Sequence, residues 1–358
     1  EEVILNEGLE KIGAEAFSNP NIKSITIPGS VKEIGKSTFS GCKNLEEVIL
    51  NEGLEKIGAE AFSNPNIKSI TIPGSVKEID KSTFSGCKNL EEVILNEGLE
   101  KIGAEAFSNT NIKSITIPGS VKEIDKSTFS GCENLEEVIL NEGLEKIGWY
   151  AFSNPNIKSI TIPGSVKEIG WRTFSGCENL EEVILNEGLE IIDAEAFKYT
   201  NIKSITIPGS VKEIDAEAFN YSIISNILIN SNNKNFEIKD NFFIDKNNKK
   251  ILAYLDKKTT KVTIPGSIKE IGGRAFSGCK NLEEVILNEG LEKISSGAFS
   301  NTNIKSITIP GSVKEIGWSA FSGCKNLKEV IYKGDASNIN WENIDIDKTK
   351  IKIISSNN

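Results

Sequence analysis

One pattern of apolar and polar positions repeats along almost the whole chain of 358 residues. Each unit of 22 or 23 residues has the order apolar-x-x-apolar-x-apolar, as at Leu45, Val48 and Leu50. Period-2 spacing with β-branched residues predicts a short strand. Turn-forming residues follow, Asn-Glu-Gly at 51–53 in one unit and Pro-Gly-Ser at 73–75 in the next. The pattern therefore predicts one strand and one turn in every unit.

A phenylalanine recurs at the same place in thirteen units, and two unit types alternate to give a period of 45 residues. These residues are Phe17, Phe39, Phe62, Phe84, Phe107, Phe129, Phe152, Phe174, Phe197, Phe219, Phe276, Phe299 and Phe321. One unit cannot bury its apolar face alone, whereas stacked units bury a continuous core. No segment holds ten residues of helical periodicity. We therefore predict a right-handed repeat solenoid, mostly β, with one parallel strand per coil of 22–23 residues and little helix.

The segments FSGCKNLEEVILNEGLEKIGAEAF and IKSITIPGSVKEIG resemble the BspA-type leucine-rich repeats of bacterial surface proteins, which also occur in some protists. The resemblance extends over nearly the whole chain. It implies a leucine-rich-repeat coil stack with its strands on the concave face and short turns on the convex side. Gly53 and Ser75 stand where an ordinary leucine-rich repeat has Asn or Cys, which marks the variant family.

Two regions break the pattern, so we divide the predicted single solenoid of 1–358 into four parts. Regular coils occupy 1–221 and 262–326, and 222–261 is a degenerate repeat. Apolar runs on both sides of the Asn-rich segment 245–250 predict one inserted β-hairpin there. A calcium loop at Asp245 is disfavoured because Lys250 occupies the glycine position. Residues 327–358 resemble the C-terminal cap of the family.

Composition limits the possible functions. The 41 basic and 51 acidic residues give a net charge of −10, which argues against nucleic acid as a partner. No apolar run is long enough for membrane insertion within this segment. The absence of histidine excludes histidine acid–base catalysis and His-containing zinc sites. The carboxylates recur in every coil instead of forming one distinct constellation, so we expect no enzyme activity, no cofactor and no metal.

Cysteines and charges follow the repeat. The cysteines occur in every second coil, at Cys42, Cys87, Cys132, Cys177, Cys279 and Cys324. Their expected separation of about 9.5 Å exceeds the roughly 7 Å that a disulfide allows, so we predict buried thiols. Lysine and glutamate alternate between neighbouring coils, as at Glu46, Lys68 and Glu91. We interpret these columns as charge pairs that fix the register of the coils.

The first candidate binding site is where the repeat departs from itself. The position three residues before each phenylalanine is normally Ala or Lys, which indicates exposure, but tryptophan replaces it in two consecutive coils, which would stack the rings about 5 Å apart. Trp, Tyr and Arg are enriched at binding hot spots. The candidate residues are Trp149, Tyr150, Trp171, Arg172, Ile191 and Tyr199. Drift or local packing is the alternative, since Trp318 shows the same substitution standing alone.

The second candidate is the inner face of the strand sheet, at the positions between the buried residues of each strand. There Ile94 and Ile139 alternate with threonines, and Glu92 and Glu137 alternate with serines. This face is either a partner-binding groove or cross-strand packing without a partner.

The expected function is a non-enzymatic, adhesin-like recognition module. The resemblance implies an extracellular or cell-surface protein that binds a protein or other macromolecule of a host matrix or neighbouring cell. The alternative is a passive spacer that presents another domain. A spacer has no reason to break its repeat at clustered exposed positions. Because the chain opens within a repeat, without an initiator methionine or signal peptide, we expect a segment of a longer protein.

Overall fold

The computed structural model describes residues 2–17, 21–335, 337, 339–341, 344 and 348–354. Its residues group into two compact units. Unit 1 consists of Glu1–Ile214 and Ala218–Ile223, and unit 2 of Asp215–Glu217 and Ile224–Asn358. The continuity of one solenoid through both units stays a prediction.

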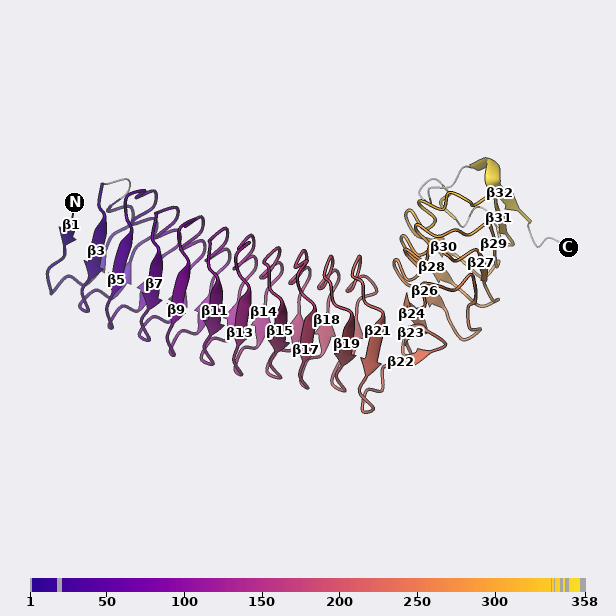
Figure 1. The fold of residues 1–358 in the computed structure, drawn as a ribbon, viewed down its shortest axis with the longest axis horizontal. Coiled ribbons are helices and arrows are strands. Elements are labelled where there is room, and N and C mark those ends of the chain that lie inside the picture. The colour runs from indigo at the N-terminus through magenta and orange to yellow at the C-terminus, as the bar shows by residue number, and fades with distance from the viewer. Residues whose placement is uncertain are drawn as a thin grey trace. The chain divides into compact units, whose positions relative to one another are not determined.

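Each coil of unit 1 contributes a longer and a shorter strand (Figure 1). The longer strands are β1 (Glu2–Ile4), β3 (Ser24–Ile27), β5 (Glu47–Leu50), β7 (Ser69–Ile72), β9 (Glu92–Leu95), β11 (Ser114–Ile117), β13 (Glu137–Leu140), β15 (Ser159–Ile162), β17 (Glu182–Leu185) and β19 (Ser204–Ile207). The shorter ones are β2 (Lys11–Ile12), β4 (Glu33–Ile34), β6 (Lys56–Ile57), β8 (Glu78–Ile79), β10 (Lys101–Ile102), β12 (Glu123–Ile124), β14 (Lys146–Ile147), β16 (Glu168–Ile169), β18 (Ile191–Ile192) and β20 (Glu213–Ile214).

Both strand sets are parallel, as predicted for a β-solenoid. The longer strands pair in register, for example Ser69 with Glu92 and Thr71 with Ile94. The shorter strands form one ten-stranded sheet from β2 to β20. The repeat pattern predicted one strand per coil, and this second sheet was not predicted because two residues are too few to show alternation.

The core of unit 1 is a column of stacked phenylalanines. From Phe17 to Phe219, neighbouring ring centroids lie 5.0 to 5.6 Å apart, with interplanar angles within 9°. Along β7 and its equivalents the second and fourth residues are buried and the first and third are exposed. The apolar pattern of each coil therefore fills one continuous interior.

The turns around Phe39 to Phe197 adopt left-handed backbone at two positions of each coil. At the first, φ is 59° for Glu60 and 54° for Ser82. At the second, φ is 65° for Asn64 and 72° for Gly86. The turn amides donate to the next coil, as from Glu60 N to the carbonyl of Lys81 at 2.9 Å. Hydrogen bonding between coils thus extends beyond the strands into the turns.

Charge ladders connect the coils as predicted. Lys68 pairs with Glu46 at 2.9 Å and Lys113 with Glu91 at 2.5 Å. Glu52 of one coil accepts hydrogen bonds from the amides of Gly74 and Ser75 in the next, each at 3.0 Å. These two bonds, from Gly74 first, hold the pKa of Glu52 below its usual range. Glu97, Glu142 and Glu187 repeat the arrangement.

All six cysteines are buried and none forms a disulfide, which confirms the prediction. The Cys87 thiol donates to the carbonyl of Phe62 in the preceding coil, with Sγ 3.0 Å from the oxygen. Burial raises the pKa of Cys87 to about 12. These thiols therefore act as small apolar core residues.

Unit 2 contains the inserted hairpin and further coils (Figure 1). Its strands are β21 (Asn226–Ile229), β22 (Phe236–Lys239), β23 (Phe242–Asp245), β24 (Lys250–Tyr254), β25 (Lys261–Thr263), β26 (Glu270–Ile271), β27 (Glu284–Ile286), β28 (Lys293–Ile294), β29 (Ser306–Ile309), β30 (Glu315–Ile316), β31 (Glu329–Tyr332) and β32 (Ile351–Ile353). A 3₁₀ helix, Lys348–Lys350, precedes β32.

The hairpin prediction is confirmed by the antiparallel pairing of β23 with β24. Strand β22, which was not predicted as a separate strand, adds a third antiparallel strand beside β23. From β24 onward the pairing is again parallel. In the predicted cap 327–358, β32 pairs in parallel with β31, and residues 336, 338, 342–343, 345–347 and 355–358 lie outside the described residues. Over the described chain, we find no helix with the length and apolar character needed to cross a bilayer.

Candidate functional site: an aromatic–cation cluster

The turns of four consecutive coils in unit 1 carry aromatic and cationic side chains at positions where the regular coils carry Ala, Lys, Glu, Ser, Asn or Gly. We call this set the aromatic–cation cluster. Its members are Trp149, Tyr150, Trp171, Arg172, Glu195, Lys198, Tyr199 and Tyr221. The shared backbone frame places these residues on equivalent turns of successive coils.

Trp171 lies at the centre of the first half of the cluster. Its ring centroid is 6.2 Å from that of Trp149, at an angle of 87°. It is 5.0 Å from that of Tyr150, at 71°. Both contacts have the edge-to-face geometry that aromatic quadrupoles favour. The predicted 5 Å stack of tryptophans is therefore replaced by an edge-to-face pair, in which the Trp149 ring packs over Gly170.

Arg172 joins the rings to an acidic residue. Its guanidinium carbon lies 4.7 Å from the Trp171 centroid and 5.6 Å from that of Tyr150. Nη1 donates a hydrogen bond to the Tyr150 hydroxyl at 2.9 Å, and Nε pairs with the carboxylate of Glu195. Three further N–H groups of the five on a guanidinium have no protein acceptor among the described residues. Arg172 thus presents unused donors beside exposed rings.

Glu195 links the two halves of the cluster. Its second oxygen lies 2.8 Å from Nζ of Lys198. Burial alone would raise the pKa of Glu195, but hydrogen bonds from Lys198 and Arg172 outweigh burial and hold the pKa below its usual range. The carboxylate is therefore ionised near neutral pH and fixes both cations.

Tyr199 and Tyr221 form the second half. Their rings stack with centroids 4.9 Å apart and planes 14° from parallel. Nζ of Lys198 lies 5.3 Å from the centroid of Tyr199 and 5.7 Å from that of Tyr221. Both tyrosine side chains are 47% exposed. They form a flat aromatic pair that solvent reaches.

A bulky residue in left-handed backbone sets these two tyrosines apart from the same position of the other coils. Their φ angles are 56° and 57°, at the second left-handed position of the turn. Other coils of unit 1 hold asparagine or glycine there, as at Asn109 and Gly131. Asparagine and glycine adopt this conformation readily, whereas a bulky residue there is strained by about 1–2 kcal/mol. If folding stability alone determined the residue at this position, Asn or Gly would be favoured over tyrosine.

The structure brings together five of the six residues predicted for this site. Trp149 is 55% exposed, as expected, but Trp171 is partly buried because Tyr150 and Arg172 pack on it. Ile191 lies instead in β18, between Glu168 and Glu213. Glu195, Lys198 and Tyr221 belong to the cluster but were not predicted from the sequence. Tyr221 could have been found in the sequence, because it stands where the other coils have Asn or Gly. The predicted end of the regular coils at residue 221 drew attention away from it.

The four residues of the second candidate lie on the longer strands of unit 1. Ile94 and Ile139 are 46% and 45% exposed, and Glu92 and Glu137 are also exposed. Ile139 pairs with Thr116 and Glu137 with Ser114. The face therefore has alternating Ile/Thr and Glu/Ser rows and does not touch the cluster on the turns.

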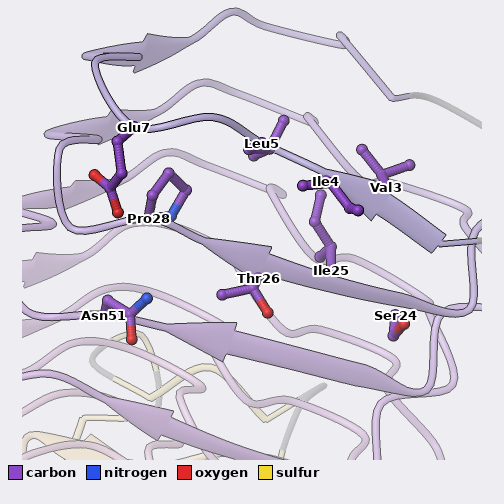
Figure 2. A pocket seen from close by; sticks show the side chains of 9 residues that line it. All are labelled: Val3, Ile4, Leu5, Glu7, Ser24, Ile25, Thr26, Pro28 and Asn51. Atoms are coloured by element: carbon purple, nitrogen blue, oxygen red, sulfur yellow. The ribbon is translucent and has the colours of Figure 1, made fainter.

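A hollow of about 320 Å³ opens on the strands at β1 and β3, as Figure 2 shows. Its lining includes Ile4, Ser24 and Thr26, with Asn51 from the next coil. Glu7 is the one ionisable side chain in this lining. The hollow therefore lacks a pair of groups for acid–base chemistry. In the part of the chain that the structure describes, no group of three or more Cys, Asp or Glu is placed to hold a metal ion.

Comparison with known proteins identifies the family. The family described as "BspA type Leucine rich repeat region (6 copies)" matches residues 10–136, 100–226 and 248–357. No curated protein sequence matches the chain.

Several solved structures are similar. A leucine-rich repeat protein from Bacteroides ovatus is 25% identical with a TM-score of 0.59, covering 99% of this chain and 91% of that one. One from Eubacterium ventriosum is 23% identical with a TM-score of 0.52, covering 75% and 73%. A leucine rich cell surface protein from Faecalibacterium prausnitzii is 22% identical with a TM-score of 0.48, covering 97% and 90%. The repeat, the parallel coils and the family match agree, and the chain belongs to the BspA type leucine rich repeat family.

Proposed function

We propose that the protein is a non-catalytic recognition module at the cell surface or in the secreted fraction. In this proposal it binds a protein or other macromolecule of a host or neighbouring cell through the aromatic–cation cluster. Membership of the BspA type family supports the proposal, because its repeats resemble those of bacterial surface proteins. The extended surface of a solenoid suits a large partner.

The observation that carries the proposal is that Tyr199 and Tyr221 occupy left-handed backbone where the regular coils hold Asn or Gly. Strained residues are retained where they serve a function. Exposed Trp, Tyr and Arg together form the kind of patch that dominates binding energy at interfaces. Glu195 fixes both cations in advance, so little side-chain entropy is lost when a partner docks.

A passive spacer is the alternative function. The regularity of the coils before Gly148 favours it, because their exposed lysines and glutamates pair with one another between coils. A spacer needs no cluster, so the two functions differ in what the cluster contributes.

The test is saturation binding of labelled protein to host-cell layers and to extracellular-matrix coatings. The variant W149A/W171K restores the residues that regular coils carry and should reduce affinity at least tenfold while the protein stays folded. The matched control is W318A, which removes a single exposed tryptophan from unit 2 and should leave binding unchanged. Equal binding by the parent and W149A/W171K would reject the site. An absence of saturable binding by the parent would favour the spacer.

A further inference from the structure

The longer strands of unit 1 present a second regular surface, which we call the strand face. It consists of the exposed first and third residues of β3 to β19. Every second strand presents Glu and Ile, and the strands between present Ser and Thr. The isoleucines are Ile49, Ile94, Ile139 and Ile184, each 45–47% exposed. The face therefore carries an apolar row beside an acidic row.

The acidic row has no cation of its own in unit 1. Within the described part of that unit, no Lys or Arg lies at ion-pair distance from Glu47, Glu92, Glu137 or Glu182. The preceding glutamates, by contrast, pair with lysines, as Glu46 does with Lys68 at 2.9 Å. In these four Glu-Glu pairs of unit 1, the first glutamate is therefore paired with a lysine and the second is not.

Unit 2 shows which chemical group can lie opposite the second glutamate of a Glu-Glu pair on the strands. There Lys261 of β25 replaces the serine of the regular coil and pairs with Glu284 of β27 at 2.9 Å. Lys352 of β32 lies opposite Ile331 in the register and reaches Glu329 of β31 diagonally. An ammonium group therefore lies on the strand beside the glutamate in unit 2, and the equivalent place in unit 1 is available to a partner.

The spacing of the row selects the conformation of that partner. Parallel strands lie about 4.8 Å apart, so glutamates in every second coil recur at about 9.6 Å. A polyproline II helix has three residues per turn at about 3.1 Å each, a repeat of about 9.3 Å. Two turns of an α-helix span about 10.8 Å. Over the three intervals of the row, the mismatch is about 0.9 Å for polyproline II and about 3.6 Å for the α-helix.

The two rows also fit the three-sided section of a polyproline II helix. With a cation at every third residue, one edge faces the glutamates and the adjacent edge faces the isoleucines. Proline on that second edge packs on the exposed Ile side chains. Because the conformation is formed before binding, docking orders few further residues.

We propose that the strand face of unit 1 binds a proline-rich segment of a partner protein that carries Lys or Arg at every third residue and runs across the strands. This site is separate from the aromatic–cation cluster and does not depend on the proposed function of the cluster.

Fluorescence anisotropy with labelled synthetic peptides at 0.15 M salt tests the proposal. The peptide (Pro-Pro-Lys)5 should bind saturably. The peptide (Pro-Pro-Pro-Lys)5 has the same number of lysines at the wrong spacing and should bind at least tenfold more weakly. The acidic peptide (Pro-Pro-Glu)5 should not bind. Equal binding of the two lysine peptides would show only a general attraction of the protein for polycations, and it would overturn the proposal. The proposal would also be overturned if (Pro-Pro-Lys)5 showed no saturable binding.

The protein variants use residues that the repeat itself provides. E92S/E137S and I94T/I139T convert one coil type to the other on the strand face, and each should weaken (Pro-Pro-Lys)5 at least fivefold. The control E60S/E105S makes the same change of net charge on the turns, where regular coils also carry serine, and should leave the affinity within twofold. The proposal would be overturned if E60S/E105S lost as much affinity for (Pro-Pro-Lys)5 as E92S/E137S. W149A/W171K should bind (Pro-Pro-Lys)5 with the affinity of the parent. The experiments can therefore reject the strand-face proposal and the proposed function of the cluster separately.

Discussion

Two stretches of unit 1 have the same frame and different turns. The regular stretch contains Phe62, Phe84, Phe107 and Phe129, and the altered stretch contains Phe152, Phe174, Phe197 and Phe219. Ring centroids are 5.3–5.6 Å apart in the first and 5.5–5.6 Å in the second. At the first left-handed position, Glu60 has a φ of 59° and Tyr150 a φ of 57°. The frame accepts an aromatic surface without changing its core, so the outer turn residues are available for selection by function.

The largest expected effect tests whether the two cores are equal. Phe84→Ala in the regular stretch and Phe174→Ala in the altered stretch should each lower the free energy of unfolding by about 3–5 kcal/mol, because each removes a fully buried ring. Urea unfolding followed by circular dichroism measures both. The two losses of unfolding free energy should differ by less than about 1.5 kcal/mol, the upper end of the stabilisation by an aromatic pair. A larger difference would mean that the cluster stabilises the core.

The next effect concerns Gly170, over which Trp149 packs. A Cβ at Gly170 would lie 2.9 Å from Cδ1 of Trp149. Gly170→Asp should therefore cost about 1–3 kcal/mol. Regular coils carry Asp80 and Asp125 at this position, so the cost should disappear in a Trp149→Ala background. A double-mutant cycle on unfolding free energies measures the coupling. Equal costs in both backgrounds would show that the ring does not occupy that space.

A smaller effect is expected from exchanging residues at the second left-handed position. Asn109→Tyr in a regular coil should destabilise by about 1–2 kcal/mol, because the strain gains no stacking partner. Tyr199→Asn with Tyr221→Gly should change stability little, since relief of strain offsets a lost ring pair worth about 0.5–1.5 kcal/mol. Thermal unfolding of both variants checks this. If the two tyrosine replacements strongly destabilise the protein, the Tyr199–Tyr221 pair contributes to folding stability and its presence needs no binding function.

The smallest effect is a pH dependence that both stretches share. Amide hydrogen bonds lower the pKa of Glu52, Glu97, Glu142 and Glu187. A lowered folded-state pKa contributes stability above the unfolded value of 4.5, and this stability is lost as the pH falls through the folded pKa. Replacing all four by Gln should lower the melting temperature at pH 7 more than at pH 3. A uniform shift at both pH values would contradict the role of these carboxylates.

Much of the fold was predictable because every coil repeats the same evidence. The apolar spacing gave the longer strands, and the alternation of Lys68 with Glu46 and Glu91 gave their register. The two-residue strands such as β8 were missed, since their pairing depends on backbone hydrogen bonds between coils and not on side-chain alternation. Strand β22 was not recognised as a separate strand because Phe236 and Ile238 were taken with Phe242–Ile244 as one apolar run.

The site was predictable only in part. Trp149 and Trp171 stood out because they replace Ala and Lys. Glu195 was hidden because it is the consensus residue of its column, and only the structure shows that it holds Arg172 and Lys198. The strain at Tyr199 and Tyr221 depends on a backbone angle, which the sequence indicates only through the Asn and Gly of the other coils.

The most direct test of the central claim moves the cluster four coils toward the N-terminus. In a protein with W149A/W171K, the substitutions A59W, E60Y, D80G, K81W, S82R, S108K, N109Y and G131Y rebuild the cluster in the regular stretch, where Glu105 already stands for Glu195. Saturation binding to the surface that the parent recognises is then measured. The account predicts that affinity returns to within about threefold of the parent, or roughly 0.7 kcal/mol. A folded transplant that binds no better than W149A/W171K would contradict it.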